Sequence, residues 1–314
     1  MRMEKTTPRD FFLWFGAVIA LYGSIAALIT LLFEYINYVF PDPLAYYADP
    51  YGGAIRFSMA TLIVLTPTAL MLLHLIRKAL MREPSRAQVW IRRWALMLTL
   101  FIAGTTILID LITLINTFLG GEITVRFALK VAVVLLIAFG VALHFLADLR
   151  GYWILHPRRA TLIGLASGLL VLLTVVAGFF IVGSPHQMRL FRYDEQKTSD
   201  LQTIQYEIVN YWQQKEALPK SLNELVTPMT GFVVPSDPQT GTSYRYETTG
   251  DLAFKLCSTF NLPSRDLEGR GGYPMHDTSY PGMPMSDNWE HGTGETCFDR
   301  TIDPDFYPPY EKAQ

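Results

Sequence analysis

Charged residues and cysteines are both scarce in this chain of 314 residues. Only 17% of the residues are Asp, Glu, Lys or Arg, half are hydrophobic, and the mean hydropathy is positive. Soluble globular domains carry about 25% charged residues, so this composition excludes an ordinary soluble protein. The only cysteines are Cys257 and Cys297, and both lie in the last third of the chain.

Arrangements of residues that carry enzymatic chemistry are also missing. His276 and His291 do not have the spacing of metal ligands, either to each other or to a cysteine. We find no Ser-His-Asp arrangement, no glycine-rich phosphate loop and no pair of carboxylates suited to acid–base catalysis. We therefore expect a protein without enzymatic activity, without catalytic residues and without a cofactor-binding site.

The few charges are unevenly distributed between two parts of the chain. Residues 1–184 hold fifteen Lys and Arg against nine Asp and Glu, whereas residues 185–314 hold eleven against nineteen. The near-neutral total of −2 therefore combines a basic first part with an acidic second part. Nucleic acid is an unlikely partner of the second part, because phosphate binding needs a surplus of Lys and Arg on one face.

Long uncharged runs dominate the first part. A helix of about 20 residues rises about 30 Å, the thickness of the hydrocarbon core of a membrane. The first run lacks the short apolar core and small-residue cleavage site of a signal peptide, so we expect it to be retained. The sequence predicts five transmembrane helices, over residues 11–33, 57–76, 94–119, 127–147 and 160–183.

Basic residues predict the orientation of these spans in the cytoplasmic membrane. The N-terminus and the connections 77–93 and 148–159 hold twelve Lys and Arg, against Arg56 and Arg126 in the connections on the other side. Because the basic connections stay inside, we expect the N-terminus inside and residues 185–314 outside.

The second part has the pattern of a small α+β domain. Leu201, Ile204, Ile208 and Tyr211 recur at helical spacing in a segment that we expect to begin at Asp194. Ser221 and Glu224 have the spacing of a capping box. Residues 244–246 and 252–259 alternate like two strands joined at Thr249-Gly250, and residues 263–285 are rich in Gly and Pro, which predicts a long irregular loop.

Several short motifs follow one another in residues 194–260. They are Asp200-Leu201-Gln202-x-Ile204, Tyr211, Leu218-Pro219, Ser221-Leu222-x-Glu224-Leu225, Pro235-x-Asp237-Pro238-x-Thr240-Gly241, Tyr244-x-Tyr246 and Leu256-Cys257. In this order they resemble the globular domain of type II secretion major pseudopilins and type IV pilin-like proteins. The resemblance implies a long helix packed on a three- or four-stranded sheet.

The last span resembles a pilin leader helix through Thr161-Leu162-Ile163, but it departs from the family at two positions. Arg159 stands near the position of the glycine that prepilin peptidase cleaves, and Gly164 stands at the position of the glutamate used in subunit packing. We therefore expect neither cleavage near Ala160 nor assembly into a filament. Residues 1–155 are similar to a bacterial membrane-domain family of unknown function, which implies no activity.

Two charged residues lie within predicted spans. Asp110 lies in the third span and Lys130 near the start of the fourth, and the turn at Gly120-Gly121 brings the two within reach of an ion pair. One alternative is a structural pair that holds the two helices together. The other is a proton or ion relay that involves His74 and His144.

Carboxylates and amides in the second part suit a hard cation such as calcium. They are Asp237, Asp251, Asp287, Asn288, Glu290 and Asp299. Pseudopilins of this type bind calcium, but no loop here has the ordered ligand spacing of a calcium motif. The metal site is therefore left open between calcium ligands and solvated turn carboxylates.

A disulfide between Cys257 and Cys297 is expected, because both residues fall in the part that the basic connections place in an oxidising compartment. The bond would hold the C-terminal segment with Trp289 and Phe298 against the strand that carries Leu256. Two unrelated thiols are the alternative.

Two functions follow from these features. The first is a non-enzymatic integral membrane protein with domains at 1–184 and 185–314, which displays a pilin-like domain for interaction or assembly with protein partners in a secretion or pilus apparatus. The second is a small transporter or channel with Asp110, Lys130 and Asn116 along its path. The lipid bilayer is a partner in both.

Overall fold

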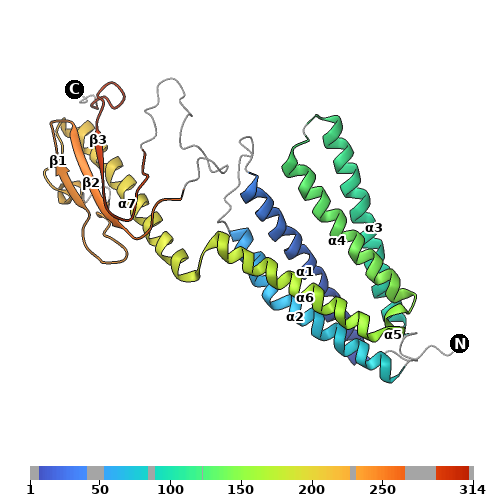
Figure 1. The fold of residues 1–314 in the computed structure, drawn as a ribbon. Helices are drawn as coiled ribbons and strands as arrows, with labels where there is room; N and C mark the ends of the chain where they lie inside the picture. The colour runs from blue at the N-terminus through green and yellow to red at the C-terminus, as the bar shows by residue number, and fades with distance from the viewer. Residues whose placement is uncertain are drawn as a thin grey trace. The chain divides into compact units, whose positions relative to one another are not determined.

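The computed structural model describes residues 7–40, 53–83, 89–121, 123–226, 231–265 and 288–310. The chain divides between Gly183 and Ser184 into two compact units. Most of the Gly- and Pro-rich segment 263–285, as well as His276 and Asp287, lies outside the described residues. The first unit is helical, and the second combines a long helix with a small sheet (Figure 1).

Five helices of the first unit are long and apolar enough to cross a membrane. They have 25 to 32 residues, so each rises at least about 37 Å. A short sixth helix connects two of them. The bounds are Pro8–Val39 (α1), Gly53–Arg82 (α2), Trp90–Leu119 (α3), Val125–Leu149 (α4), Tyr152–Leu155 (α5) and Pro157–Val182 (α6). Four of the predicted spans lie within these helices, and the fifth, 160–183, ends one residue beyond α6. The helices extend beyond the predicted spans into their polar flanks.

Small residues allow close packing between helices of this unit. A Cβ atom added at Gly23 of α1 would lie 2.5 Å from Cδ1 of Leu65 in α2, and one added at Gly178 of α6 would lie 2.6 Å from Sδ of Met59. Membrane helices often associate through such positions, because lipid supplies no hydrophobic driving force between them. The chain thus packs α1 on α2 and α2 on α6, while α3 and α4 run side by side (Figure 1).

Large apolar side chains cover the outer faces of these helices. Phe101 and Ile112 of α3 are 71% and 66% exposed, and Phe180 of α6 is 86% exposed. In water such surfaces would be costly, whereas the hydrocarbon of a membrane solvates them. The outer surface of the first unit is therefore suited to the hydrocarbon interior of a membrane.

The second unit begins with the helix α7, Pro185–Lys215. The prediction that this helix starts at Asp194 was wrong by nine residues. Ser184 and Gln187 form a capping box, and Pro185 occupies the first helical position, where its missing N–H costs nothing. The preceding Gly183 has φ 88° and ψ 177°, a conformation that is essentially restricted to glycine, so α6 and α7 are separate helices.

Three antiparallel strands form the sheet in the order β1-β2-β3. They are Arg245–Thr248 (β1), Ala253–Phe260 (β2) and Gly294–Thr301 (β3). The predicted hairpin is present, with Thr248 opposite Phe254. Helix α7 lies along one face of the sheet (Figure 1), and the core between them consists of buried residues from both: Leu201, Ile204, Ile208, Trp212, Tyr244, Phe254, Leu256, Phe260, Phe298 and Ile302, with Leu222 and Leu225 from the connection.

A short 3-10 helix, Leu222–Leu225 (η2), follows α7. The predicted capping box at its start is not formed, because Ser221 makes no side-chain cap. The Glu224 carboxylate instead accepts hydrogen bonds from the Lys220 backbone N–H and from the Tyr211 hydroxyl, both at 3.1 Å. These bonds fasten the turn to the side of α7.

Candidate functional site

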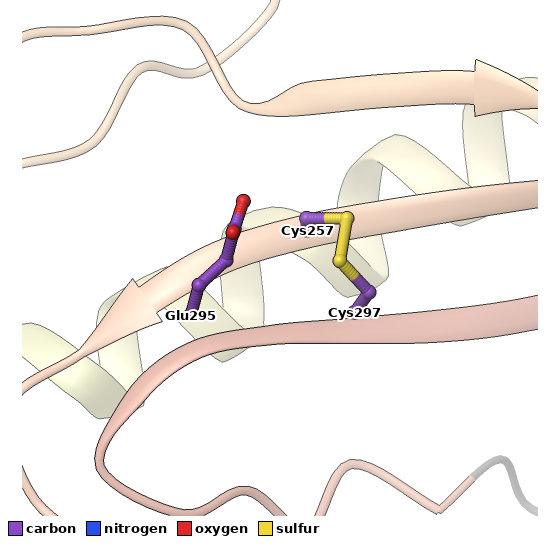
Figure 2. Close-up of side chains that lie close together, drawn as sticks. All are labelled: Cys257, Glu295 and Cys297. Carbon is purple, nitrogen blue, oxygen red and sulfur yellow. A yellow bond between two sulfur atoms is a disulfide. The ribbon is translucent and has the colours of Figure 1, made fainter.

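Cys257 and Cys297 form a disulfide in the structure (Figure 2). They face each other on neighbouring strands, with Cα atoms 4.1 Å apart. The bond therefore joins the central strand β2 to the edge strand β3. As predicted, it holds the C-terminal segment to the sheet, where the rings of Trp289 and Phe298 lie 4.7 Å apart between centroids.

Glu295 lies beside this disulfide (Figure 2), and its carboxylate and the two sulfur atoms lie within 4.8 Å of one another. Within the part of the chain that the structure describes, no other three metal-ligating side chains come together so closely. Metals bind the cysteine thiolate, which a disulfide no longer provides. Glu295 instead pairs with Arg245 at 3.2 Å, so the arrangement is structural.

Of the candidate calcium ligands that the structure describes, Asp237 and Asp299 have other partners, and Asn288 and Glu290 bond to each other. Oδ1 of Asp237 accepts the backbone N–H groups of Gln239 and Thr240 at 2.7 and 3.1 Å, which fixes the turn. Asp299 pairs with Lys255 at 3.3 Å. Asn288 accepts the backbone N–H of Glu290 at 2.7 Å, and Asp251 is exposed in the hairpin turn.

A buried lysine is the most unusual polar group of the second unit. Lys197 of α7 is 2% exposed and donates hydrogen bonds to the Thr259 carbonyl at 2.8 Å and to Oε1 of Gln239 at 3.1 Å. Its Nζ lies 3.4 Å from Oδ2 of Asp237 and 3.8 Å from Oδ1 of Asp194. Two carboxylates and two neutral oxygens thus surround one ammonium group, which a buried charge requires.

The carboxylate of Asp194 also holds the end of β2. It accepts the backbone N–H groups of Asn261 and Leu262 at 3.0 Å and the Asn261 amide at 2.8 Å. One helical turn after Lys197, Asp200 accepts the Tyr244 hydroxyl at 2.7 Å. Burial, together with this bond to Asp200, raises the pKa of Tyr244 well above its ordinary value.

Hereafter the lysine cluster means Asp194, Lys197, Asp237, Gln239 and Asn261. It ties α7 to the turn before β1 and to the end of β2. The lysine cluster is therefore a structural clamp between these three segments.

The sequence contains one local signal of this cluster, which was not among the predicted site residues. Lys197 precedes Leu201 by four residues and Ile204 by seven, so it lies on the apolar stripe of the helix, as does Asp194. A lysine and an aspartate on such a stripe predict a buried ion pair. The other residues that bind Lys197 are 40 or more residues away in the sequence, so no local pattern indicates them.

Asp110 and Lys130 are the charged residues that lie within the predicted spans. Asp110 lies in α3, and its Oδ2 atom is buried without a hydrogen-bond partner. The ammonium group of Lys130 in α4 lies 5.4 Å from the centroid of the Phe33 ring. The ion pair between Asp110 and Lys130 stays a prediction. Of the histidines named for a relay, His144 stacks on Trp153 with centroids 5.0 Å apart.

A contact of a basic residue joins the start of α3 to the end of α4. Arg92 is buried, and its Nη2 donates to the backbone carbonyl of Asp148 at 3.0 Å and to its carboxylate at 3.2 Å. We had counted Arg92 among the cations of the connection 77–93. It lies in the first turn of α3, where it caps the neighbouring helix.

Comparison with known proteins gives one match. Residues 10–145 match the family model of a domain of unknown function, DUF5671. No curated protein and no solved structure matches the chain. The matched segment covers the first four membrane-span helices and agrees with the expected membrane-domain family of unknown function, whereas the pilin-like resemblance of residues 194–260 finds no match. The first part of this chain is thus similar to a domain to which no activity is attached.

Proposed function

We propose that this protein is a non-enzymatic integral membrane protein that displays a pilin-like domain outside the cytoplasmic membrane. The domain serves as an interaction or assembly surface for a secretion or pilus apparatus. In this proposal the N-terminus is inside, residues 1–184 anchor the protein, and residues 185–314 form the displayed domain.

One observation carries the proposal. Directly after the last span, α7 packs its apolar stripe on a three-stranded antiparallel sheet. This is the arrangement that the pilin-like motifs imply. Those motifs also take part in the packing, since Asp237 and Asp200 bind Lys197 and Tyr244.

The orientation is supported by the basic residues of the connections and by the disulfide. Twelve Lys and Arg lie on the side proposed to be inside, against two in the short connections on the other side. A disulfide in the second unit is consistent with an oxidising compartment.

Photo-crosslinking in living cells tests the interaction role. A photoreactive amino acid is placed in the full-length chain at Tyr206 and, separately, at Val233, which are 65% and 75% exposed. We expect discrete adducts in which mass spectrometry identifies peptides of a secretion or pilus apparatus. Ile208, which is fully buried, serves as the control position and should give none. Adducts restricted to lipid, or none at either exposed position, would contradict the interaction role.

A transporter or channel is the second candidate. The observation in its favour is the buried Oδ2 of Asp110 without a hydrogen-bond partner, because unsatisfied carboxylates within spans often line a path. Asn116 and Lys130 lie further along the same pair of helices. Asp110→Asn and Lys130→Met, singly and together, test it by ion and solute fluxes in proteoliposomes. Loss of flux by a well-folded variant supports the transporter, and unchanged flux in the double variant rules it out.

A further inference from the structure

The segment in which the chain leaves the last span carries a net positive charge, although the second unit as a whole is acidic. Residues 184–193 contain Arg189 and Arg192 and no acidic residue, whereas residues 194–314 contain nine Lys and Arg against nineteen Asp and Glu. The first turns of α7 thus differ in charge from everything that follows them.

These arginines are arranged with aromatic rings. Arg189 and Arg192 are exposed, and with Tyr193 they occupy one face of α7 at spacings of three and four residues. The Arg189 guanidinium donates from Nε and Nη2 to the Tyr193 hydroxyl at 3.3 and 3.1 Å, which uses two of its five N–H groups. On the adjoining face, the Arg265 guanidinium stacks 3.9 Å from the centroid of the Phe191 ring.

The chain itself brings this surface close to a membrane. Arg189 is the sixth residue and Arg192 the ninth after Gly183, at the end of α6. At about 1.5 Å per helical residue and about 3.5 Å for the extended Ser184, they lie at most about 11 and 16 Å along the chain from the end of the span. The headgroup layer is roughly 5–8 Å thick on each side. An anionic surface attracts cations within a Debye length of about 8–10 Å.

We propose that Arg189 and Arg192, flanked by Tyr193 and the stacked pair Arg265–Phe191, form a docking surface for the anionic headgroups of the membrane's own phospholipids. Arginine matches phosphate oxygens with two parallel N–H donors, and tyrosine is favoured at the headgroup level. The short tether gives these lipids a high effective concentration. The proposal does not depend on which side of the membrane the second unit occupies, nor on a pilin-like role.

Spin labelling of the full-length protein in nanodiscs tests the proposal. Ser199→Cys introduces the only reactive thiol, because the two native cysteines are joined, and Ser199 is exposed on α7. A nickel-chelating lipid in the headgroup plane relaxes a nitroxide that approaches the surface. We expect stronger relaxation in nanodiscs of phosphatidylcholine with phosphatidylglycerol than in phosphatidylcholine alone, and a loss of this difference in high salt.

Matched variants then assign the effect to the arginines. Each arginine near an anionic surface strengthens binding about fivefold, so the ratio of docked to undocked protein should fall about 25-fold in Arg189→Gln/Arg192→Gln. Lys215→Gln/Lys220→Gln removes two exposed cations, one in the last turn of α7 and one beyond it, and should retain the difference. Equal relaxation in the two lipid compositions would overturn the proposal without any variant. A difference that survives the arginine variant, or disappears equally in the lysine variant, would also overturn it.

Discussion

Lys197 shows how a single buried charge can define the geometry of a small domain. Its ammonium group lies among oxygens from the turn at Asp237, from the end of β2 and from its own helix. Removing a charge from water costs several kcal/mol, and good geometry repays this cost only when every partner is in place. This cluster therefore helps to fix the position of α7 along the sheet, together with the apolar core.

Lys197→Met is expected to destabilise the second unit by about 3–5 kcal/mol, because it leaves the carboxylates of Asp194 and Asp237 buried without their cation. Pulse proteolysis of the detergent-solubilised full-length protein in urea measures the change. Lys220→Met is the matched control, since Lys220 is exposed, and it should change stability by less than about 0.5 kcal/mol. Equal urea midpoints for the two variants would show that the buried carboxylates do not need the lysine.

The raised pKa of Tyr246 predicts how the stability of the second unit responds to alkaline pH. Its hydroxyl donates to the Pro219 carbonyl at 2.8 Å, and burial, with a smaller contribution from Glu224, raises its pKa from 10.0 to about 12. The folded state therefore retains a proton that the unfolded state loses, so the stabilisation is present below pH 10 and is lost as the pH rises toward 12.

We expect the urea midpoint of the wild type to fall between pH 10 and about 12, and this fall to be shallower in Tyr246→Phe. Tyr206→Phe, at an exposed position of α7, should follow the wild type. A profile of Tyr246→Phe that coincides with that of the wild type would mean that other groups cause the alkaline loss.

At the scale of elements, few apolar contacts hold β3 in the sheet. Phe298 is the only residue of this strand that is buried, and the strand is held to β2 by its ladder and by the disulfide. Cys257→Ser/Cys297→Ser is expected to cost about 4 kcal/mol in the chain-entropy model for a loop of this length, with a separation of 40 residues. Pulse proteolysis under non-reducing conditions measures the cost. Mass spectrometry that finds two freely alkylated thiols in wild-type protein isolated under oxidising conditions would refute the bond itself.

Elements with a strong local pattern could be predicted from the sequence, and those without one could not. The spans and the β1–β2 hairpin follow from uncharged runs and from alternation around Thr249-Gly250. The start of α7 was missed because its first turns carry no apolar stripe, so only Ser184 and Pro185 indicate it. Strand β3 was missed because its sequence is mostly polar and its pairing partner is about 40 residues away.

At the scale of the whole molecule, the number of spans was predictable from the sequence. Charged residues are costly in hydrocarbon, and an uncharged run of 20 or more residues has few stable structures other than a membrane-spanning helix. The packing between spans was not predictable, because it depends on close contacts such as those at Gly23 and Gly178. The orientation in the membrane stays a prediction from the basic connections.

A protease added outside spheroplasts is expected to remove the residues after about 190 and to leave the five span helices protected, because the basic connections are retained inside. An epitope at the C-terminus reports the cleavage. Inverted membrane vesicles provide the control and should protect the epitope until detergent is added. Protection in spheroplasts combined with cleavage in inverted vesicles would place the second unit inside.

The disulfide makes a closed covalent ring of residues 257–297, which contains half of β2, half of β3 and the whole connection between them. A single peptide-bond break anywhere in this ring releases no fragment, because Cys257 and Cys297 still join the two pieces. A cut chain would migrate as one molecule on a non-reducing gel and as two on a reducing gel. The C-terminal segment could thus be nicked and still stay attached to its membrane anchor until a reductant reaches the sheet.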